Sequence, residues 1–268
     1  QRESLRAEGK LVKTPRSTLL LAVCCGLAAA CTQRQERLKL MSYNIRNGIG
    51  IDNIQDIGRI ARVILREAPD LVALQELDSA TLRVDGRYIP GELGRMTGMH
   101  ATFGRAIGFA GGSYGIGLLS RTEPLAVRSI PLPGREEARV LLMAEFPDYT
   151  VCITHLSLTP EDRLASLPII REATDTCRKP VLLAGDFNTG NAAAVLAGLG
   201  GGFRILSDTT RMTFPSDNPA VRIDYILGRG LPTSATVAES AVDHTATASD
   251  HCPLWVTLVW KRGKQPGK

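Results

Sequence analysis

Hydrophobic positions follow two different patterns over residues 38–79. Short apolar runs at residues 38–43 and 71–74 are bounded by turn-forming and charged residues, which is typical of buried strands. Between the two runs, Asp52 and Gln55 have the spacing of a helix-capping box. Apolar residues around and after this signal recur at helical spacing and predict one apolar helix face: Ile54, Ile57, Ala61, Ile64 and Leu65. The pattern predicts a strand, a helix and a second strand that is closed by Gln75-Glu76.

Most of the remaining chain predicts strands at short spacing. A looser helical segment covers residues 91–99. Strands are predicted at residues 101–105, 114–120, 125–130, 140–146, 150–156, 181–184, 222–227, 236–242 and 254–260. Thr159 and Pro160 begin a helix that runs to about Cys177, and a shorter Ala-rich helix covers residues 191–199. Two β-rich parts with flanking helices indicate two sheets packed face to face, with the helices outside.

The composition is that of an ordinary globular protein. The chain has 268 residues, of which 44% are hydrophobic and 22% charged. No repeat or linker divides residues 38–260, so we expect one domain there. The formal charge of +5 is uneven, because residues 1–30 hold five basic residues against Glu3 and Glu8, which is +3 and leaves +2 elsewhere. That small remainder is weak support for nucleic-acid binding, and residues 261–268 are expected to form a solvated basic tail.

An apolar run at residues 19–30 follows a basic segment. The run is too short to span a bilayer and has the length of a signal-peptide core. It ends in Leu27-Ala28-Ala29-Ala30-Cys31, which resembles a bacterial lipoprotein signal with Cys31 as the lipidated residue. Because Ala28 is a less usual residue at its position, plain signal cleavage stays an alternative. We expect a leader at 1–30, a short linker at 31–37, and an exported protein that is membrane-anchored or secreted.

Six cysteines are present, and two of them fall inside the expected leader. If Cys31 is lipidated, Cys152, Cys177 and Cys252 remain. None belongs to a Cys-x-x-Cys pair, so the sequence indicates neither a disulfide framework nor a zinc site. Cys152 and Cys252 lie in apolar strand contexts and are expected to be small core residues.

Polar residues that could do chemistry cluster at the ends of the predicted strands. The residues in question are Asn44, Glu76, His155, Asp186, Asn188, Asp224 and His251. In mid-strand such groups would be buried without partners, whereas at strand ends they can converge on one rim. The positions therefore predict a polar site at one edge of the paired sheets.

Glu76 follows a run of apolar and small residues. A carboxylate in that setting is paired, protonated or bound to a cation. Mg²⁺ takes one or two carboxylates plus water, so Glu76 with Asn44 or Asp250 would suit it, with Mn²⁺ as an alternative ion. The competing interpretation is an exposed acid in a loop.

Asp186 and Asn188 lie two residues apart in Gly185-Asp186-Phe187-Asn188. In that arrangement Asp186 can orient or deprotonate a water while Asn188 donates to a charged oxygen. The same tetrapeptide also has the composition of a tight turn.

Asp224 and His251 are candidate partners in proton transfer. Imidazole titrates near neutral pH, and a carboxylate that hydrogen-bonds it stabilises its charged form. The alternatives are a surface pair of Asp224 with Arg222, and a turn or helix cap at Ser249-Asp250.

Two further residues are candidate contacts to an anion. His155 ends a predicted strand and could touch a phosphate or leaving group, although a satisfied core histidine is the competing interpretation. Arg139 follows two acidic residues and could contact a phosphate, or belong to a solvated charge cluster.

Taken together, the motifs resemble the endonuclease/exonuclease/phosphatase superfamily of metal-dependent phosphoesterases, which includes DNase I. Seven short segments occur in the order of that family: MSYNIR (41–46), LVALQE (71–76), YGIGLLSR (114–121), THL (154–156), AGDFN (184–188), RIDYIL (222–227) and SDHCP (249–253). The resemblance implies a DNase I-like four-layer α/β/β/α sandwich of two mixed sheets, with the active site at one sheet edge. It also implies that Glu76 is the main Mg²⁺ ligand, with Asn44 and Asp250 near the same ion.

The catalytic roles that the resemblance implies fall on five residues. His251, paired with Asp224, would be the acid/base histidine. Asp186 and Asn188 would position the attacking water and the phosphate, and His155 would bind or protonate at the phosphate. The chain departs from the pattern in its middle motif, where Ile116 stands in place of a common Asn and Ser113 in place of an active-site Tyr. Tyr114 is accordingly left out of the expected catalytic set.

The function expected from the sequence is Mg²⁺-dependent phosphoester hydrolysis outside the cytoplasm, by a monomer. The substrate class stays open among soluble phosphoesters, lipid head groups and nucleic acid, because fold and core chemistry do not choose among them. A secreted nuclease is one alternative. The other is a surface-anchored binding module without catalysis, which would have gaps in its metal or acid/base residues.

Overall fold

Strand β1 (Gln35–Asn44) shows how the sequence specifies the layers of the fold. The computed structural model describes residues 35–261, and β1 is buried from Leu38 onward. Because successive side chains of a strand point to opposite faces, Leu38 and Leu40 enter the core between the sheets, whereas Met41 and Tyr43 enter a second core beneath helices. A strand buried on both faces has a mostly apolar sequence, which is why this strand could be predicted from the sequence.

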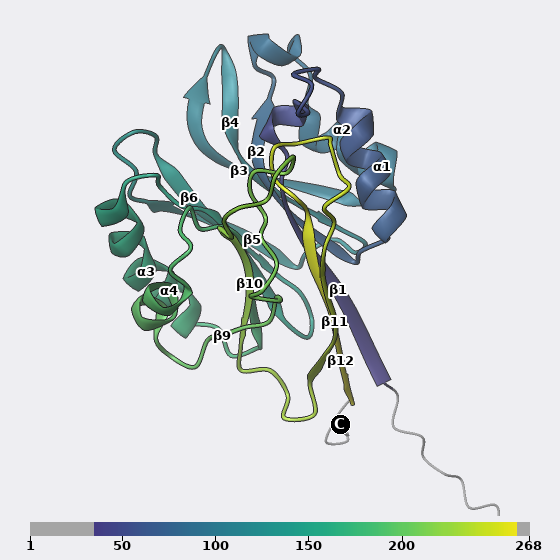
Figure 1. Cartoon of the computed structure of the whole chain (residues 1–268). Coiled ribbons are helices and arrows are strands. Elements are labelled where there is room, and N and C mark those ends of the chain that lie inside the picture. Colours follow the sequence, from purple (N-terminus) through teal and green to yellow (C-terminus); the bar gives the residue numbers. More distant parts are fainter. Residues whose placement is uncertain (1–34, 262–268) are drawn as a thin grey trace, which may run out of the picture. The chain divides into compact units, whose positions relative to one another are not determined.

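Two six-stranded sheets form the centre of the described residues (Figure 1). Sheet I has the order β11-β12-β1-β2-β4-β3. Its other strands are β2 (Leu71–Ser79), β3 (His100–Phe109), β4 (Gly112–Ser120), β11 (Thr236–Val242) and β12 (Leu254–Lys261). Sheet II has the order β5-β6-β7-β8-β10-β9. Its strands are β5 (Ala126–Leu132), β6 (Arg139–Glu145), β7 (Thr150–His155), β8 (Val181–Asp186), β9 (Arg204–Ile205) and β10 (Asp224–Arg229).

Both sheets are mixed, and each has one parallel pair at its centre. β1 pairs with β2 in parallel, and β7 pairs with β8 in parallel. The remaining pairs are antiparallel. A parallel pair needs a crossover connection, and here α1 (Ile57–Glu67) and α3 (Pro160–Asp175) supply the two crossovers.

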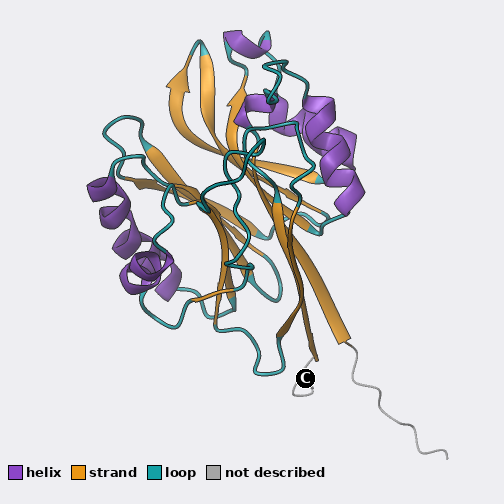
Figure 2. Ribbon diagram, viewed as in Figure 1, coloured by secondary structure: helices purple, strands orange, loops and turns teal. Residues whose placement is uncertain are grey.

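Helices cover the outer face of each sheet (Figure 2). α1 and α2 (Ile89–Thr97) pack on sheet I, where they share a core with Met41 and Val72. α3 and α4 (Ala192–Leu199) pack on sheet II over Met143 and Leu183. A third core fills the space between the sheets. The layers therefore run helix, sheet, sheet, helix, which confirms the predicted four-layer sandwich.

Helix α1 begins later than the sequence predicted. Its N-cap is Asp56, and Asp52 instead accepts hydrogen bonds from the Ile54 amide at 3.1 Å and the Arg59 guanidinium at 2.8 Å. The capping-box prediction was therefore wrong. Ile54 and Leu65 are 60% and 52% exposed, so the apolar face is turned away from both of them. The buried positions on α1 are Ile57, Ile60, Ala61, Val63 and Ile64.

Strand β2 continues past the predicted stop at Gln75-Glu76. The pairing register with β4 shifts between Leu74 and Leu77, and Glu76 within the bulge has a φ of 58°. A bulge leaves its extra residue outside the ladder and redirects its side chain. Glu76 therefore lies in a strand bulge rather than at the strand end, and β2 extends to Ser79.

Some expectations fall on residues outside the described range. These are the leader at 1–30, Cys31, and residues 262–268 of the expected basic tail. Within residues 35–261, no helix has the length and apolar character that crossing a membrane requires. Cys152 and Cys252 are buried in the core, as predicted, and Cys177 is partly exposed.

Candidate active site

The polar site lies where strand ends from the two sheets meet, which we call the active-site edge. It is formed by the C-terminal ends of β1, β7 and β8, the bulge within β2, the start of β10 and the segment before β12. Parallel pairing places His155 beside Asp186, and antiparallel pairing places Asp224 opposite Asp186. Strand register thus brings His155, Asp186 and Asp224 together, and His251 joins them from the segment before β12.

Asn44 joins the two sheets at this edge. Its Nδ2 donates to Oε1 of Glu76 at 3.0 Å and to Oδ2 of Asp186 at 3.1 Å. The same nitrogen lies 3.5 Å from Nε2 of His251. The backbone of Asn44 is itself held in place, because Ser249 Oγ donates a hydrogen bond to the Asn44 carbonyl at 2.8 Å. Asn44 therefore reaches the same carboxylates that a bound cation would reach.

His251 and Asp224 form a buried pair. Nδ1 of His251 lies 3.0 Å from Oδ2 of Asp224, whose side chain is 1% exposed. The ring of Phe214 packs against the imidazole with ring centroids 4.8 Å apart. These contacts direct Nε2 of His251 toward Asp186, 3.7 Å away. Arg222 does not pair with Asp224 as one interpretation of the sequence held, and instead donates to Ser207 Oγ at 2.7 Å.

The surroundings of His251 favour its charged form. Burial by itself lowers the pKa of an imidazole, but the carboxylates of Asp224 and Asp186 outweigh burial and raise the pKa of His251 above its ordinary value. A histidine at this position holds a proton that it can deliver, and Asp224 stabilises the charge while the proton is present.

Asp186 contacts residues from three sides. His155 Nε2 lies 3.5 Å from Oδ2 of Asp186, and the Asn188 amide donates to Oδ1 at 2.8 Å. The Asn188 side chain in turn donates to the Leu156 carbonyl at 2.8 Å. Burial, followed by the nearby charge of Asp224, raises the pKa of the Asp186 carboxyl.

His155 differs from His251 in its electrostatic surroundings. Burial, followed by the charges of Arg139 and His251, lowers the pKa of His155 well below its ordinary value. One histidine of the site therefore favours the charged form and the other the neutral form. When the pKa values of two neighbouring groups are shifted in opposite directions, one group can act as a proton donor and the other as a neutral hydrogen-bonding group.

The acidic groups of the site fit a divalent cation. Ligand atoms of Asp186, Asp224 and His251 all lie within 4.8 Å of one another, and the three residues are buried. Oδ1 of Asp224 is buried and has no hydrogen-bond partner within residues 35–261. Glu76 joins this group through Asn44. Buried carboxylates this close need positive charge nearby, which charged His251 supplies in part, and their oxygen atoms are donors that also suit a hard ion.

Asp250 lies apart from this buried group. Its carboxylate is 33% exposed, and its Oδ2 is 3.5 Å from Nε of Arg46. Ser249 Oγ lies 3.4 Å from the other carboxylate oxygen. Of the expected metal set, Glu76 and Asn44 are in contact, whereas Asp250 contacts Arg46 and Ser249 instead.

Arg139 is buried rather than solvated. Its side chain is 6% exposed and lies between two carboxylates, 3.4 Å from Glu136 and 3.1 Å from Glu137. Its Nε is buried without a partner in the described part of the chain. The solvated-cluster interpretation was therefore wrong, and the role of Arg139 as a phosphate contact stays a prediction.

Glu136 organises the backbone that follows His155. It accepts hydrogen bonds from Ser157 Oγ at 2.6 Å, from the Leu158 amide at 2.7 Å and from Thr159 Oγ1 at 3.1 Å. Burial alone raises the pKa of Glu136, but these hydrogen bonds outweigh burial and lower it to about 2. In the sequence, Glu136 is recognisable only as part of a charged cluster.

Two parts of the site were missed from the sequence. Thr213 Oγ1 accepts from the amides of Ile223 and Asp224 at 3.2 and 3.4 Å, and Phe214 packs on His251. Both belong to an irregular segment without periodicity, so no local pattern could have placed them. Tyr114 is buried beside the site, with the Arg83 guanidinium 5.2 Å from its ring centroid.

The sequence profile of the Endonuclease/Exonuclease/phosphatase family matches residues 41–251. This match covers most of the chain and spans Asn44 through His251, so the chain belongs to that family. Enzymes of this family are phosphoester hydrolases that depend on a divalent metal ion, and the buried Asp-Asp-His group described above could bind one.

Solved structures share the fold. The endonuclease/exonuclease/phosphatase from Beutenbergia cavernae is 23% identical, with a TM-score of 0.67 over 84% of this chain and 72% of that chain. A mannosyl-6-phosphatase from Bacteroides thetaiotaomicron is 19% identical, with a TM-score of 0.66 over 82% and 99%. TDP2 from D. rerio, complexed with single-strand DNA product, is 22% identical, with a TM-score of 0.63 over 83% and 99%. A search of curated proteins gave no match.

Proposed function

We propose that this phosphoesterase uses Mg²⁺ and an Asp224–His251 pair to hydrolyse a phosphodiester or phosphomonoester by attack of water on phosphorus. The observation that carries the proposal is the 3.0 Å contact within that buried pair, which directs Nε2 of His251 toward Asp186 and Asn44. Proton transfer needs a group whose charge changes near neutral pH and a neighbour that stabilises the charged form.

Glu76, Asn44 and Asp250 are the residues proposed to hold the ion. Mg²⁺, or Mn²⁺ in its place, would polarise the phosphoryl oxygens and stabilise charge on the leaving group. The 3.0 Å hydrogen bond from Asn44 Nδ2 to Glu76 Oε1 supports this assignment only in that it places the two side chains next to each other. Asp250 supports it by its position next to His251 in the chain and its partly exposed carboxylate.

The remaining residues would position the water and the phosphate. Asp186 would orient the water, because its carboxylate is held by Asn188 and Asn44. His251 would exchange a proton at Nε2 while Asp224 stabilises the imidazolium. His155, which favours the neutral form, would donate a hydrogen bond to the phosphate. Arg139 would contribute positive charge behind His155.

A binding module without catalysis is the alternative of a different class. Such a protein would lack parts of the metal or acid/base set. Here Asn44, Glu76, Asp186 and His251 are all present, and Asn44 contacts each of the other three. The contacts support the enzyme over the binding module.

Hydrolysis assays across three substrate classes test the proposed function and identify its substrate. Residues 32–268 would be incubated with Mg²⁺ and plasmid DNA, with sphingomyelin or phosphatidylinositol vesicles, and with a set of soluble phosphomonoesters. We expect one class to be cleaved, and cleavage to stop when a chelator removes the ion. Cleavage of plasmid DNA alone would identify the chain as a nuclease. Binding of one class without cleavage of any would contradict the enzyme and favour the binding module.

We also propose that the protein acts outside the cytoplasm and is anchored through a lipid on Cys31. The support is the apolar run at residues 19–30 that ends directly before Cys31. Expression of the full precursor in a bacterial host, followed by fractionation and mass spectrometry of the N-terminal peptide, tests this. We expect a diacylated Cys31 in the membrane fraction and loss of the anchor in Cys31→Ser. An unmodified N-terminal peptide in the cytoplasm would contradict the proposal.

A further inference from the structure

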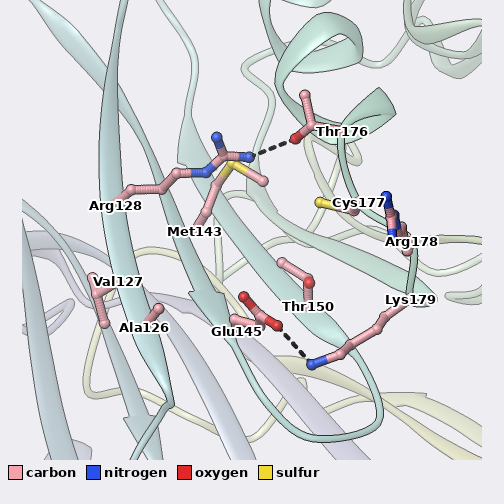
Figure 3. Close-up of a pocket in the computed structure, with 10 residues that line it drawn as sticks. All are labelled: Ala126, Val127, Arg128, Met143, Glu145, Thr150, Thr176, Cys177, Arg178 and Lys179. Atoms are coloured by element: carbon pink, nitrogen blue, oxygen red, sulfur yellow. Dashed lines mark hydrogen bonds and ion pairs between the residues drawn. The ribbon is translucent and has the colours of Figure 1, made fainter.

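A cavity with charged and apolar lining residues lies at the opposite end of sheet II from the active-site edge (Figure 3). Thr150, the first residue of β7, lines the cavity, whereas His155 at the other end of β7 belongs to the active site. The two residues are five positions apart along the strand, which is about 16 Å at about 3.3 Å per residue. The cavity has a volume of about 490 Å³, which is within the size range of small-molecule sites.

The cavity forms where α3 stops covering the outer face of sheet II. Arg128 and Met143 are register partners on β5 and β6, and they form one wall. The segment from Thr176 to Lys179, between α3 and β8, forms the opposite wall. Figure 3 shows the Arg128 guanidinium reaching across to Thr176, which precedes Cys177 in this segment.

Positive charge exceeds negative charge among the residues that line the cavity. Arg128, Arg178 and Lys179 are cationic, and Glu145 is the one acid among the ten lining residues. Lys179 pairs with Glu145 at 2.6 Å. Arg128 and Arg178 have no carboxylate within ion-pair distance in the described part of the chain, so two positive charges are left without an acidic partner.

Arg128 is held in place by neutral acceptors. Its Nη2 donates to the Ala173 carbonyl at 2.9 Å and to Thr176 Oγ1 at 3.0 Å. The other donors of the guanidinium make no hydrogen bond within residues 35–261 and are free to bind a ligand. Because the side chain is already ordered, binding an anion there requires little further loss of conformational entropy.

We propose that this cavity is a second, non-catalytic binding site for a phosphate-group dianion, such as inorganic phosphate or the phosphate of a small monoester. Such a group carries nearly two negative charges at neutral pH and several strong acceptor oxygens. Two unpaired arginines match the charge, and planar guanidinium groups match the geometry of phosphate oxygens. Thr150 adds a hydroxyl, and Met143 and Val127 offer apolar contact to an organic substituent. Phosphoester hydrolysis releases anions of this kind, so the site would respond to the enzyme's own product class.

The partly exposed thiol of Cys177 offers a local readout of binding. The full chain would be alkylated with iodoacetamide in the presence of inorganic phosphate, and modification of the Cys177 peptide would be followed by mass spectrometry. Sodium chloride at the same ionic strength is the control for screening. We expect phosphate to slow alkylation of Cys177 at least threefold while chloride does not. Equal rates in the two salts would overturn the proposal.

Charge variants separate this site from the active site. Arg178→Gln removes a charge that has no acidic partner within residues 35–261, so the fold should be kept, and it should abolish most of the protection. Arg95→Gln, on the exposed side of α2, is the matched control and should leave protection unchanged. Glu145→Gln should strengthen protection, because it removes the acid that competes for Lys179. Protection should persist in His251→Ala, since the cavity lies at the other sheet end. Protection that is unchanged in Arg178→Gln, or lost in His251→Ala, would contradict a separate site.

Discussion

Nδ1 of His251 lies 3.0 Å from Oδ2 of Asp224, although 27 residues separate the two in the chain. Strand β10 presents Asp224 at its first residue, and the segment before β12 presents His251. Both side chains are buried, so water cannot substitute for either partner. The pair fixes the ring orientation of His251 and thereby determines which nitrogen faces the other polar groups.

Asp224→Asn should reduce turnover with little effect on substrate binding. The amide is nearly isosteric but does not stabilise a charged imidazole, so the contribution of acid/base catalysis, about 10²- to 10⁴-fold, should be largely lost. Steady-state kinetics should show a fall in kcat with KM changed little. A rise in KM with kcat unchanged would contradict the assigned role. His100→Gln, at an exposed histidine of β3, serves as the control variant.

Glu76→Gln should abolish stabilisation of the fold by Mg²⁺. An ion that binds only the folded state stabilises it by about 2.7 kcal/mol at a concentration 100 times its Kd. Thermal unfolding with and without Mg²⁺ should therefore give a higher Tm for the wild type with the ion and no shift for Glu76→Gln. An equal shift in both proteins would place the ion elsewhere.

Glu136→Gln should make the free energy of unfolding less dependent on pH in the acidic range. The folded-state pKa of Glu136 is about 2, against an ordinary value of 4.5. A lowered folded pKa contributes stability that is present above pH 4.5 and is lost as the pH falls toward 2. Urea unfolding should show Glu136→Gln less stable by about 1–3 kcal/mol at pH 7, with the difference shrinking at pH 3. A difference independent of pH would contradict this.

Gly185→Ala should destabilise the protein and disturb Asp186. Gly185 has a φ of 155°, and an added Cβ would lie 2.0 Å from the Thr154 carbonyl oxygen on the neighbouring strand. A loss of about 2 kcal/mol or more is expected, because backbone on both sides must move. Gly190→Ala is the control, since its Cβ would have 3.6 Å to the nearest atom. Equal urea midpoints for the two variants would refute the steric argument.

The sequence predicted the structure correctly where the residues of a short segment reflect how that segment is buried in the fold. Apolar runs such as residues 71–74 are buried on both faces, so their strand character was visible without knowledge of neighbours. His155 and Asp186, which were placed at strand ends, do meet, because parallel pairing puts the ends of β7 and β8 at one edge. The order of the layers was predicted from two β-rich parts of the sequence, each with its own flanking helices.

Other features depend on contacts that no short segment contains. The bulge at Glu76 arises from pairing of β2 with β4, which is 40 residues away. Asp52 resembles a helix cap, yet it lies in a loop before α1 and accepts a hydrogen bond from Arg59 of that helix. The loop is held by a hydrogen bond from the Ile51 amide to the Thr247 carbonyl. Thr213 and Phe214 reach the site through an irregular segment, and only the folded chain shows what they touch.

The most direct test of the central claim is a side-by-side assay of wild type and His251→Ala on the substrate that the wild type cleaves best. Initial rates would be measured with Mg²⁺, with a chelator, and after Mg²⁺ is restored. We expect the wild type to lose activity with the chelator and recover it with Mg²⁺. His251→Ala should keep the wild-type circular dichroism spectrum and lose about 10²- to 10⁴-fold in kcat. Near wild-type turnover by His251→Ala, or turnover that survives the chelator, would contradict the account.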